Sequence, residues 1–334
     1  MFATKSSTIY INEYEAGLKI LRDSAFGVDH PFRATRQLFG PNVLDTEGET
    51  HVARKKAWLA EFSGKSMSSD RVQGIVKSAT ARGFALAKER GDLMVAAVYI
   101  PNRVVLDLLG CPQIDAFDHH DRMRPITDYL ETNVKTPEVM AAKTYLRDGP
   151  FGAAPDLFAP LAQEDREREL MLLAYAAAET TMVALKCTLL FWVSRNQQFH
   201  DALAANGMDS FILSHLKNDP PLGLATRYCK RDVTVEEQRF AKGDIVHVNI
   251  VAGNADCPMS ASARRTVDLT FGTGKHSCPG HLLAKAEMEA VIERLVTMNS
   301  CELEFVQPSA DERPVNFRHP DVQILYTAKG TASA

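Results

Sequence analysis

The sequence lacks several features that define large classes of proteins. Its 334 residues include six cysteines, but there is no C-x-x-C pair and no Cys/His spacing typical of zinc. Neither a disulfide framework nor a zinc ribbon is therefore indicated. The opening stretch MFATKSSTIYINEYE has no apolar core or small-residue cleavage site of the kind that defines a secretory signal. These absences favour a reducing, cytoplasmic setting.

Neither sign of charge is in large excess. The chain carries 38 Lys and Arg against 42 Asp and Glu, a net charge of -4. This balance does not suit a general binder of phosphate backbones, so no nucleic-acid partner is expected. The hydrophobic fraction of 45% excludes a disordered chain. Because there is no internal repeat and no long polar linker, residues 1–334 are expected to form a single domain.

One apolar run, from Leu170 to Val193, is long enough to cross a bilayer. Glu179 and Lys186 interrupt it near its middle, and charged side chains are costly in lipid. We therefore expect a buried central helix with a polar function at its midpoint, and no membrane anchor.

Hydrophobic periodicity predicts a mainly α protein with minor β structure. A strand is expected at Ser7–Ile11, followed by an amphipathic helix ending near Arg22. Further helices are expected over His51–Phe62, Asp70–Arg90, Pro101–Leu109 and Arg122–Val134, and from Pro279, with short strands in Thr226–Val235 and Asp244–Ile250 and a hairpin from Cys301.

The most informative segment is FGTGKHSCPG, residues 271–280, a glycine-rich loop that delivers Cys278 to the start of a helix. A thiolate is stabilised there by the positive end of the helix dipole. Gly272 and Gly274 would let the backbone approach a flat, bulky partner. A phosphate loop is excluded because His276 stands where Ser or Thr is needed. From the residues alone, a buried unreactive cysteine remains an alternative.

This segment resembles the cysteine-ligand loop of the cytochrome P450 family, F-x-x-G-x-(R or H)-x-C-x-G. The positions that match are Phe271, Gly274, His276, Cys278 and Gly280. The resemblance implies a cytochrome P450-like fold and heme b, with Cys278 as the thiolate ligand of the iron. It also implies that Phe271 shields the sulfur, that His276 meets a heme propionate and that Gly280 belongs to the cofactor-binding loop.

Other segments resemble the family in the same order along the chain. His51 and Lys55 match its H-x-x-x-R segment, with Lys replacing Arg, and Arg227 follows Pro220-Pro221 at the distance of a propionate ligand. The implied role of all three is to bind the propionates. A solvated basic helix face is the alternative for the first pair.

The segment Ala176-Ala177-Ala178-Glu179-Thr180 resembles the family's A-G-x-(D or E)-T signature, with Ala177 in place of Gly. The resemblance implies that Glu179 and Thr180 pass protons to dioxygen. A satisfied polar pair inside a packed helix is the alternative.

The resemblance also implies a substrate pocket, and for its strand-entry residues Leu222, Leu224 and Ala225 simple core packing is the alternative. Its members are Ala176, Ala177, Leu222, Leu224 and Ala225. The run Asp118-His119-His120-Asp121 is interpreted as a solvated polar turn and not a metal cluster, because adjacent helical residues point apart.

The chain departs from the family pattern in several places. The family's E-x-x-R motif aligns with Ser214 and Lys217, so its ion pair is missing here. Lys217 is therefore expected to reach solvent without a structural role. The fold is expected to be truncated at the N-terminus, where the family's first helix is missing. It is also expected to be truncated in the lid region, because the segment between Asp115 and Glu169 looks too short for the usual lid helices.

The resemblance implies a monooxygenase of secondary metabolism that oxidises a small natural-product or amino-acid-like substrate, with dioxygen and electrons from a ferredoxin and its reductase. A basic patch would suit an acidic ferredoxin, and its expected members are Arg54, Lys55, Lys56, Lys275 and Lys285. Two alternatives stay open. One is redox-neutral or peroxide-driven chemistry at the same heme, and the other is a non-catalytic accessory protein.

Overall fold

The structure is a computed structural model that describes residues 7–149, 151, 156–258, 268–298, 303–306, 317–318, 320 and 322–326. Its helices are α1 (Tyr14–Arg22), α2 (Ala34–Phe39), α3 (Gly48–Glu61), α4 (Gly64–Met67), α5 (Asp70–Arg90), α6 (Met94–Leu108), α7 (Ala116–Thr132), α8 (Pro137–Asp148), α9 (Gln163–Ser194), α10 (Asn196–Asn218), α11 (Ile250–Asp256) and α12 (His281–Val296), with a 3-10 turn, η2, at Gly274–His276. Its strands are β1 (Thr8–Ile11), β2 (Phe26–Gly27), β3 (Leu224–Cys229), β4 (Val233–Val235), β5 (Gln238–Phe240), β6 (Ile245–Asn249), β7 (Leu303–Val306) and β8 (Gln323–Tyr326). The predicted fold class, mainly α with minor β, is confirmed.

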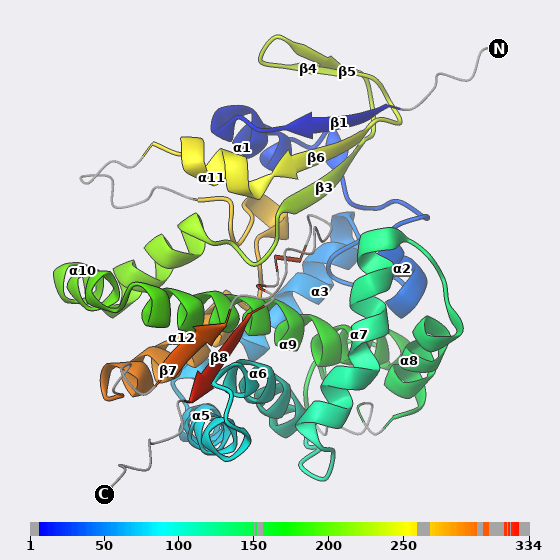
Figure 1. Cartoon of the computed structure of the whole chain (residues 1–334). Helices are drawn as coiled ribbons and strands as arrows, with labels where there is room; N and C mark the ends of the chain where they lie inside the picture. The colour runs from blue at the N-terminus through cyan, green and yellow to red at the C-terminus, as the bar shows by residue number, and fades with distance from the viewer. Residues whose placement is uncertain are drawn as a thin grey trace, which may run out of the picture.

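The helix α9 runs through the centre of the molecule, and α5, α6 and α12 pack around it or one another (Figure 1). Trp192 of α9 is completely buried in the larger hydrophobic core. By length and composition α9 could cross a membrane, but 67% of its most apolar window is buried within the fold. The predicted central helix is therefore confirmed.

A four-stranded sheet of order β1-β6-β3-β2 lies at one end of the molecule, at the top of Figure 1. β1 runs parallel to β6, and the other pairs are antiparallel. One sheet face buries Val246 and Val248 in a second, smaller core that also contains Ile11 and Ile20. The predicted C-terminal hairpin is present as the antiparallel pair of β7 and β8, while Cys301 itself lies outside the described residues.

The segment between Asp115 and Glu169 does contain two helices, α7 and α8, which pack against each other at the side of the molecule (Figure 1). Asp115 caps α7 by accepting hydrogen bonds from the amides of Phe117 and Asp118. Asn133 ends the helix in the left-handed region, with φ of 55°. The segment that was expected to be too short for the usual lid helices therefore does hold two helices.

The interpretation of the segment around His119 as a solvated turn is wrong. His119 is completely buried on α7, and its ring nitrogens lie 3.0 Å from the Tyr145 hydroxyl and 2.9 Å from the Ala174 carbonyl oxygen. Burial lowers the pKa of His119 to about 4. A neutral imidazole therefore joins α7 to α8 and α9, and the described residues form no cluster able to hold a metal ion.

Lys217 also differs from expectation. It is half-buried, and its Nζ donates a hydrogen bond to the Cys257 carbonyl at 3.2 Å. The Lys217 carbonyl in turn accepts from the Asn254 side chain at 3.1 Å. Because the flexible stem of Lys217 reaches a backbone acceptor beyond α11, this side chain links the end of α10 to the end of α11.

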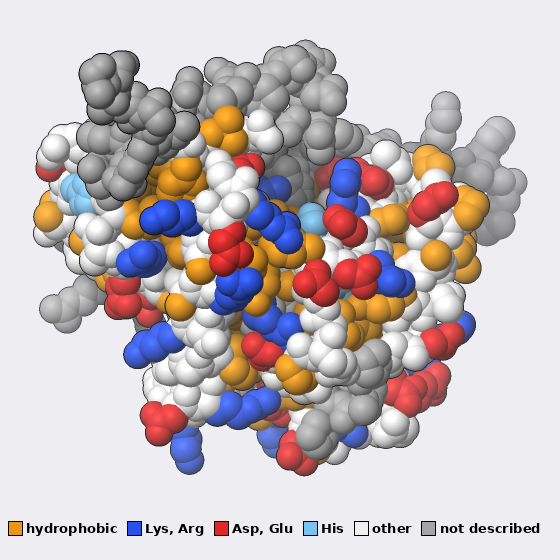
Figure 2. Space-filling model, turned by 60° about the horizontal axis from the view of Figure 1, so that its bottom comes forward, with side chains coloured by type: hydrophobic (Ala, Val, Ile, Leu, Met, Phe, Trp, Pro, Cys, Tyr) orange, Lys and Arg blue, Asp and Glu red, His pale blue; other side chains and the backbone are white. Residues whose placement is uncertain are grey.

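Most members of the expected basic patch form ion pairs with acidic side chains. Arg54 is buried in ion pairs with Asp165 and Glu169, and Lys275 and Lys285 are paired with Glu47 and Asp209. The face shown in Figure 2 likewise has acidic and basic side chains interspersed with hydrophobic ones.

A fully buried carboxyl group, Glu287 of α12, has no hydrogen-bond partner for either oxygen within the described part of the chain. Burial raises the pKa of Glu287 well above its ordinary value. At neutral pH the folded protein therefore keeps a proton that the unfolded chain has already lost. The free energy of unfolding should therefore fall as pH rises above the ordinary carboxyl pKa.

We expect Glu287→Gln to remove this dependence. Its stability advantage over the parent should grow with pH by up to about 1.4 kcal/mol per unit, between about pH 5 and pH 7. Urea unfolding at several pH values measures this slope. Glu293→Gln, an exposed site on the same helix, is the matched control. A Glu287→Gln advantage that does not change with pH would mean that Glu287 is ionised in the folded protein.

Candidate functional site

The loop from Phe271 to Cys278 turns tightly at two positions that are occupied by glycine. Gly272 and Gly274 have φ of 64° and 70°, in the left-handed region that favours glycine. The turn brings the Phe271 carbonyl within 2.7 Å of the Cys278 amide, which donates to it. Cys278 therefore lies at the end of a closed loop, shortly before α12, which begins at His281 and not at Pro279 as predicted.

Burial is the largest influence on the Cys278 thiol, and two neighbouring groups oppose it. Burial raises the pKa of Cys278, while a hydrogen bond from the Gly280 backbone and the positive charge of Lys55 act to lower it. Lys55 of α3 donates from Nζ to the Ser277 carbonyl and lies 3.4 Å from the Ser277 Oγ. A cation bound at the sulfur would offset the burial cost directly.

Two buried histidines meet beside this loop. The rings of His51 and His276 lie 4.1 Å apart, and His51 Nε2 is 3.0 Å from the Lys275 carbonyl oxygen. Burial, together with the charges of His51 and Arg227, lowers the pKa of His276 to about 3. The Nδ1 atoms of both histidines are buried and have no hydrogen-bond partner among the residues that the structure describes.

Glu47 is the carboxylate that faces these groups. Burial alone would raise the pKa of Glu47, but hydrogen bonds from Lys275 and the Val28 amide lower it to about 2. Its Oε1 lies 3.3 Å from His276 Nε2. Sequence reasoning missed Glu47, because nothing in its local pattern distinguishes it from other surface acids.

Arg227 lies on β3, where only 7% of it is exposed. Burial and the charge of Arg33 lower the pKa of Arg227 to about 10, although Glu47 opposes the shift. Arg33 precedes α2 and was also missed from sequence. The structure therefore brings together His51, His276 and Arg227 as predicted, and adds Arg33 to this group of cationic side chains.

These residues fit the propionate end of a heme. Arg227 is a buried cation beside Arg33 and Glu47, and the Nδ1 atoms of His51 and His276 need partners that the described chain does not supply. A Cβ added at Gly280, next to the cysteine loop, would meet no protein atom within 4 Å. Lys55, which is also predicted to bind a propionate, donates from its ammonium to the Ser277 carbonyl.

The predicted oxygen-side pair lies on α9. Thr180 is half-buried, and its Oγ1 donates to the Ala176 carbonyl at 3.1 Å. Ala176 and Ala177 share this partly exposed helical face, as successive turns of a helix require. Glu179 is 5% exposed, and its charge acts on Tyr175 of the same helix and on His120 of α7.

The other predicted pocket residues divide between two faces. Successive side chains of a strand point to opposite sides, so Ala225 shares the face of Arg227, whereas Leu224 lies on the face of Thr226. Leu222 packs against both hydrophobic cores and pairs with Phe317 in an isolated bridge. Leu224 and Ala225 therefore do not line the same pocket.

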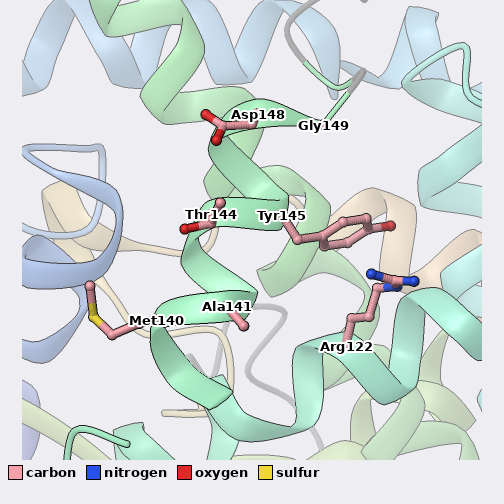
Figure 3. Close-up of a pocket in the computed structure, with 7 residues that line it drawn as sticks. All are labelled: Arg122, Met140, Ala141, Thr144, Tyr145, Asp148 and Gly149. Atoms are coloured by element: carbon pink, nitrogen blue, oxygen red, sulfur yellow. The ribbon is translucent and has the colours of Figure 1, made fainter. Parts of the chain in front are cut away.

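A shallow surface hollow of about 510 Å³ lies elsewhere, between α7 and α8. Figure 3 shows Arg122 of α7 extending toward the ring of Tyr145 of α8, and the guanidinium carbon lies 5.1 Å from the ring centroid. None of the predicted site residues lines this hollow. It is a groove on the outer side of the lid helices and not the candidate site.

Curated proteins similar to this chain are bacterial oxidative enzymes. Pulcherriminic acid synthase of Bacillus subtilis (strain 168) is 22% identical over 305 residues, which cover 78% of this chain and 74% of the relative. Mycinamicin IV hydroxylase/epoxidase of Micromonospora griseorubida is 28% identical over 306 residues, covering 77% and 76%. Cytochrome P450-SU2 of Streptomyces griseolus is 27% identical over 335 residues, covering 87% and 80%. No protein-family model matches the chain.

Solved structures share its fold. P450BioI, solved with a fatty-acyl carrier protein, superimposes with a TM-score of 0.80 at 16% identity, covering 96% of this chain and 92% of that one. The hydroxylase HmtN gives a TM-score of 0.76 at 20% identity, covering 98% and 95%. Together with the cysteine loop, these similarities support the assignment of the chain to the cytochrome P450 family.

Proposed function

We propose that this protein is a cytoplasmic heme-thiolate monooxygenase that oxidises a small natural-product or amino-acid-like substrate. The observation that carries the proposal is the closed loop presenting Cys278 beside Arg227 and two histidines, whose buried Nδ1 atoms have no hydrogen-bond partner in the described part of the chain. Heme b, when bound, supplies the redox chemistry of dioxygen. Similarity to an enzyme named as a hydroxylase/epoxidase supports this reaction class.

The chain's own residues would divide the work by position. Cys278 binds the iron, while His51, His276 and Arg227 bind the two propionates, which supply the negative charge that these buried groups lack. Phe271 lies at the start of the same loop, where its carbonyl accepts a hydrogen bond from the Cys278 amide and its ring lies 5.9 Å from the ring of His281. Its proposed role is to shield the sulfur.

Oxygenation of a C–H bond consumes dioxygen, two electrons and two protons, and yields the alcohol and water. The protons must reach a water-poor cavity, so a side chain has to deliver them. Thr180 Oγ1 donates its own proton to the Ala176 carbonyl and so presents its lone pairs as acceptors on the partly exposed face of α9. The adjacent Glu179 carboxyl is the nearest acid along the chain that can resupply the proton.

Electrons would come from an acidic ferredoxin that docks on α3. This helix exposes Lys56 beside two large apolar side chains, Val52 at 64% exposure and Leu59 at 45%. Exposed apolar groups near an unpaired cation suit a transient protein interface better than the extended basic patch expected from sequence.

The test is turnover of a panel of small natural products and amino-acid derivatives under three conditions: dioxygen with reduced ferredoxin, peroxide alone, and neither. A product carrying one atom from isotopically labelled dioxygen, formed only under the first condition, supports the monooxygenase. Equal product without an oxidant or reductant would establish redox-neutral chemistry instead.

Replacement of Thr180 should uncouple electron consumption from product formation. In Thr180→Ala we expect product per reductant consumed to fall several-fold and hydrogen peroxide to rise, because the hydroxyl that directs protons is absent. Heme content should be unchanged. Thr188→Ala is the matched control, since Thr188 makes the same bond to the carbonyl four residues earlier in the same helix, at 2.8 Å. Unchanged coupling in Thr180→Ala would remove Thr180 from the oxygen chemistry.

A further inference from the structure

We propose that Lys55 is a positioning residue for the thiolate ligand, holding the Cys278 loop by its backbone instead of binding a heme propionate. The inference rests on the proposed heme-thiolate function, and it assigns to Lys55 a task different from the one that the family resemblance implies. This role would explain how the cysteine loop is held in place in a chain that has Ser214 and Lys217 at the positions of the family's E-x-x-R motif.

The contacts form a two-point clamp from one helix face. His51 and Lys55 are four residues apart on α3, so their side chains lie on the same face, one turn from each other. His51 contacts the Lys275 carbonyl at 3.0 Å, and Lys55 donates to the Ser277 carbonyl. These two carbonyls flank His276, so α3 grips the loop on both sides of that residue, and the second grip is on the residue that precedes Cys278.

The helix that carries the clamp is itself fixed to the centre of the fold. Arg54, adjacent to Lys55, bonds Glu169 of α9 at 2.6 Å and Asp165 at 2.5 Å. Trp58 donates from Nε1 to Glu169 at 2.7 Å. Because α3 cannot shift without breaking these buried bonds, the Lys55 ammonium is held at a defined position against the loop.

The position of Lys55 also has an electrostatic consequence. Lys55 Nζ bonds the carbonyl of Ser277, the residue that precedes Cys278, so its positive charge lies close to the cysteine. A cation at this position favours thiolate over thiol. It also favours the more negatively charged, reduced state of a metal bound at that sulfur, so loss of the cation should lower the midpoint potential.

The experiment compares three variants of the holoprotein: Lys55→Met, Lys55→Arg and the control Lys56→Met. Lys56 is the exposed neighbour, so its replacement removes the same charge without touching the loop. The readouts are the Soret band of the reduced carbon monoxide complex, the one-electron midpoint potential, and the rate of heme transfer to apomyoglobin.

In Lys55→Met we expect the fraction of the complex that lacks thiolate ligation to rise at least several-fold. We also expect the ferric-to-ferrous equilibrium to shift toward ferric, a shift of 59 mV for each ten-fold change in a one-electron couple. Lys55→Arg should keep the potential close to that of the parent, and Lys56→Met should match the parent in every readout.

Two results would overturn the inference. Faster heme transfer from Lys55→Met with an unchanged Soret band and potential would assign Lys55 to a propionate. An equal shift of potential in Lys56→Met would show a general charge effect and no positioning role. A parent protein without the thiolate band would instead refute the proposed function, so the two failures are distinguishable.

Discussion

Cys278→Ala should abolish thiolate ligation entirely. The purified variant is expected to lose most of its heme, and its reduced carbon monoxide complex should lack the strongly red-shifted Soret band that the parent shows. The reason is that no second sulfur is available: of the described cysteines, only Cys278 lies in the loop beside Lys55 and the paired histidines. Absorption spectra and heme content of parent and variant measure the effect.

Cys187→Ala is the matched control for this experiment. Cys187 is another half-buried free cysteine, and it lies on α9. Burial raises the pKa of Cys187 to about 12, so it stays a neutral thiol. Its replacement should leave the Soret band in place. If Cys278→Ala kept the parent spectrum, the central assignment of this site would be wrong.

The sequence carries the cysteine loop almost completely, because its geometry is set by local residue types. Gly272 and Gly274 have positive φ, which favours glycine, and Cys278 follows them at a fixed spacing. The motif in the sequence therefore predicts the turn in the structure. The central helix was predictable for a similar reason, since an apolar run with internal charge suits only a protein core. Both features depend on neighbours in sequence.

The parts that sequence missed depend on contacts between distant segments. Arg54 looks like one more cation of a basic helix, but α9 brings Glu169 to it from more than a hundred residues away. His119 was interpreted as part of a solvated turn because adjacent helical residues point apart, whereas packing of α8 and α9 buries it. Only the tertiary fold decides which of several similar charges is buried.

The buried pair of Arg54 and Glu169 should contribute strongly to stability. The Arg54 and Glu169 side chains are 2% and 0% exposed, and the Glu169 carboxylate also accepts from Trp58 and from the Val43 amide at 3.3 Å. Glu169→Ala leaves the guanidinium uncompensated, apart from the half-exposed Asp165. We expect a loss of about 3–5 kcal/mol in the free energy of unfolding, the range found when one partner of a buried pair is removed.

Urea unfolding followed by circular dichroism measures this loss, and Arg82→Ala is the comparison. Arg82 pairs with Glu89 at 2.9 Å, but both side chains are more than half exposed, so that variant should lose no more than about 1 kcal/mol. The double variant Arg54→Met, Glu169→Gln keeps an acceptor for Trp58 and removes both charges together. It should recover most of the stability lost in Glu169→Ala, because a neutral pair has no uncompensated charge. A double variant as unstable as Glu169→Ala would show that the geometry of the ion pair, and not the avoidance of a lone buried charge, holds α3 against α9.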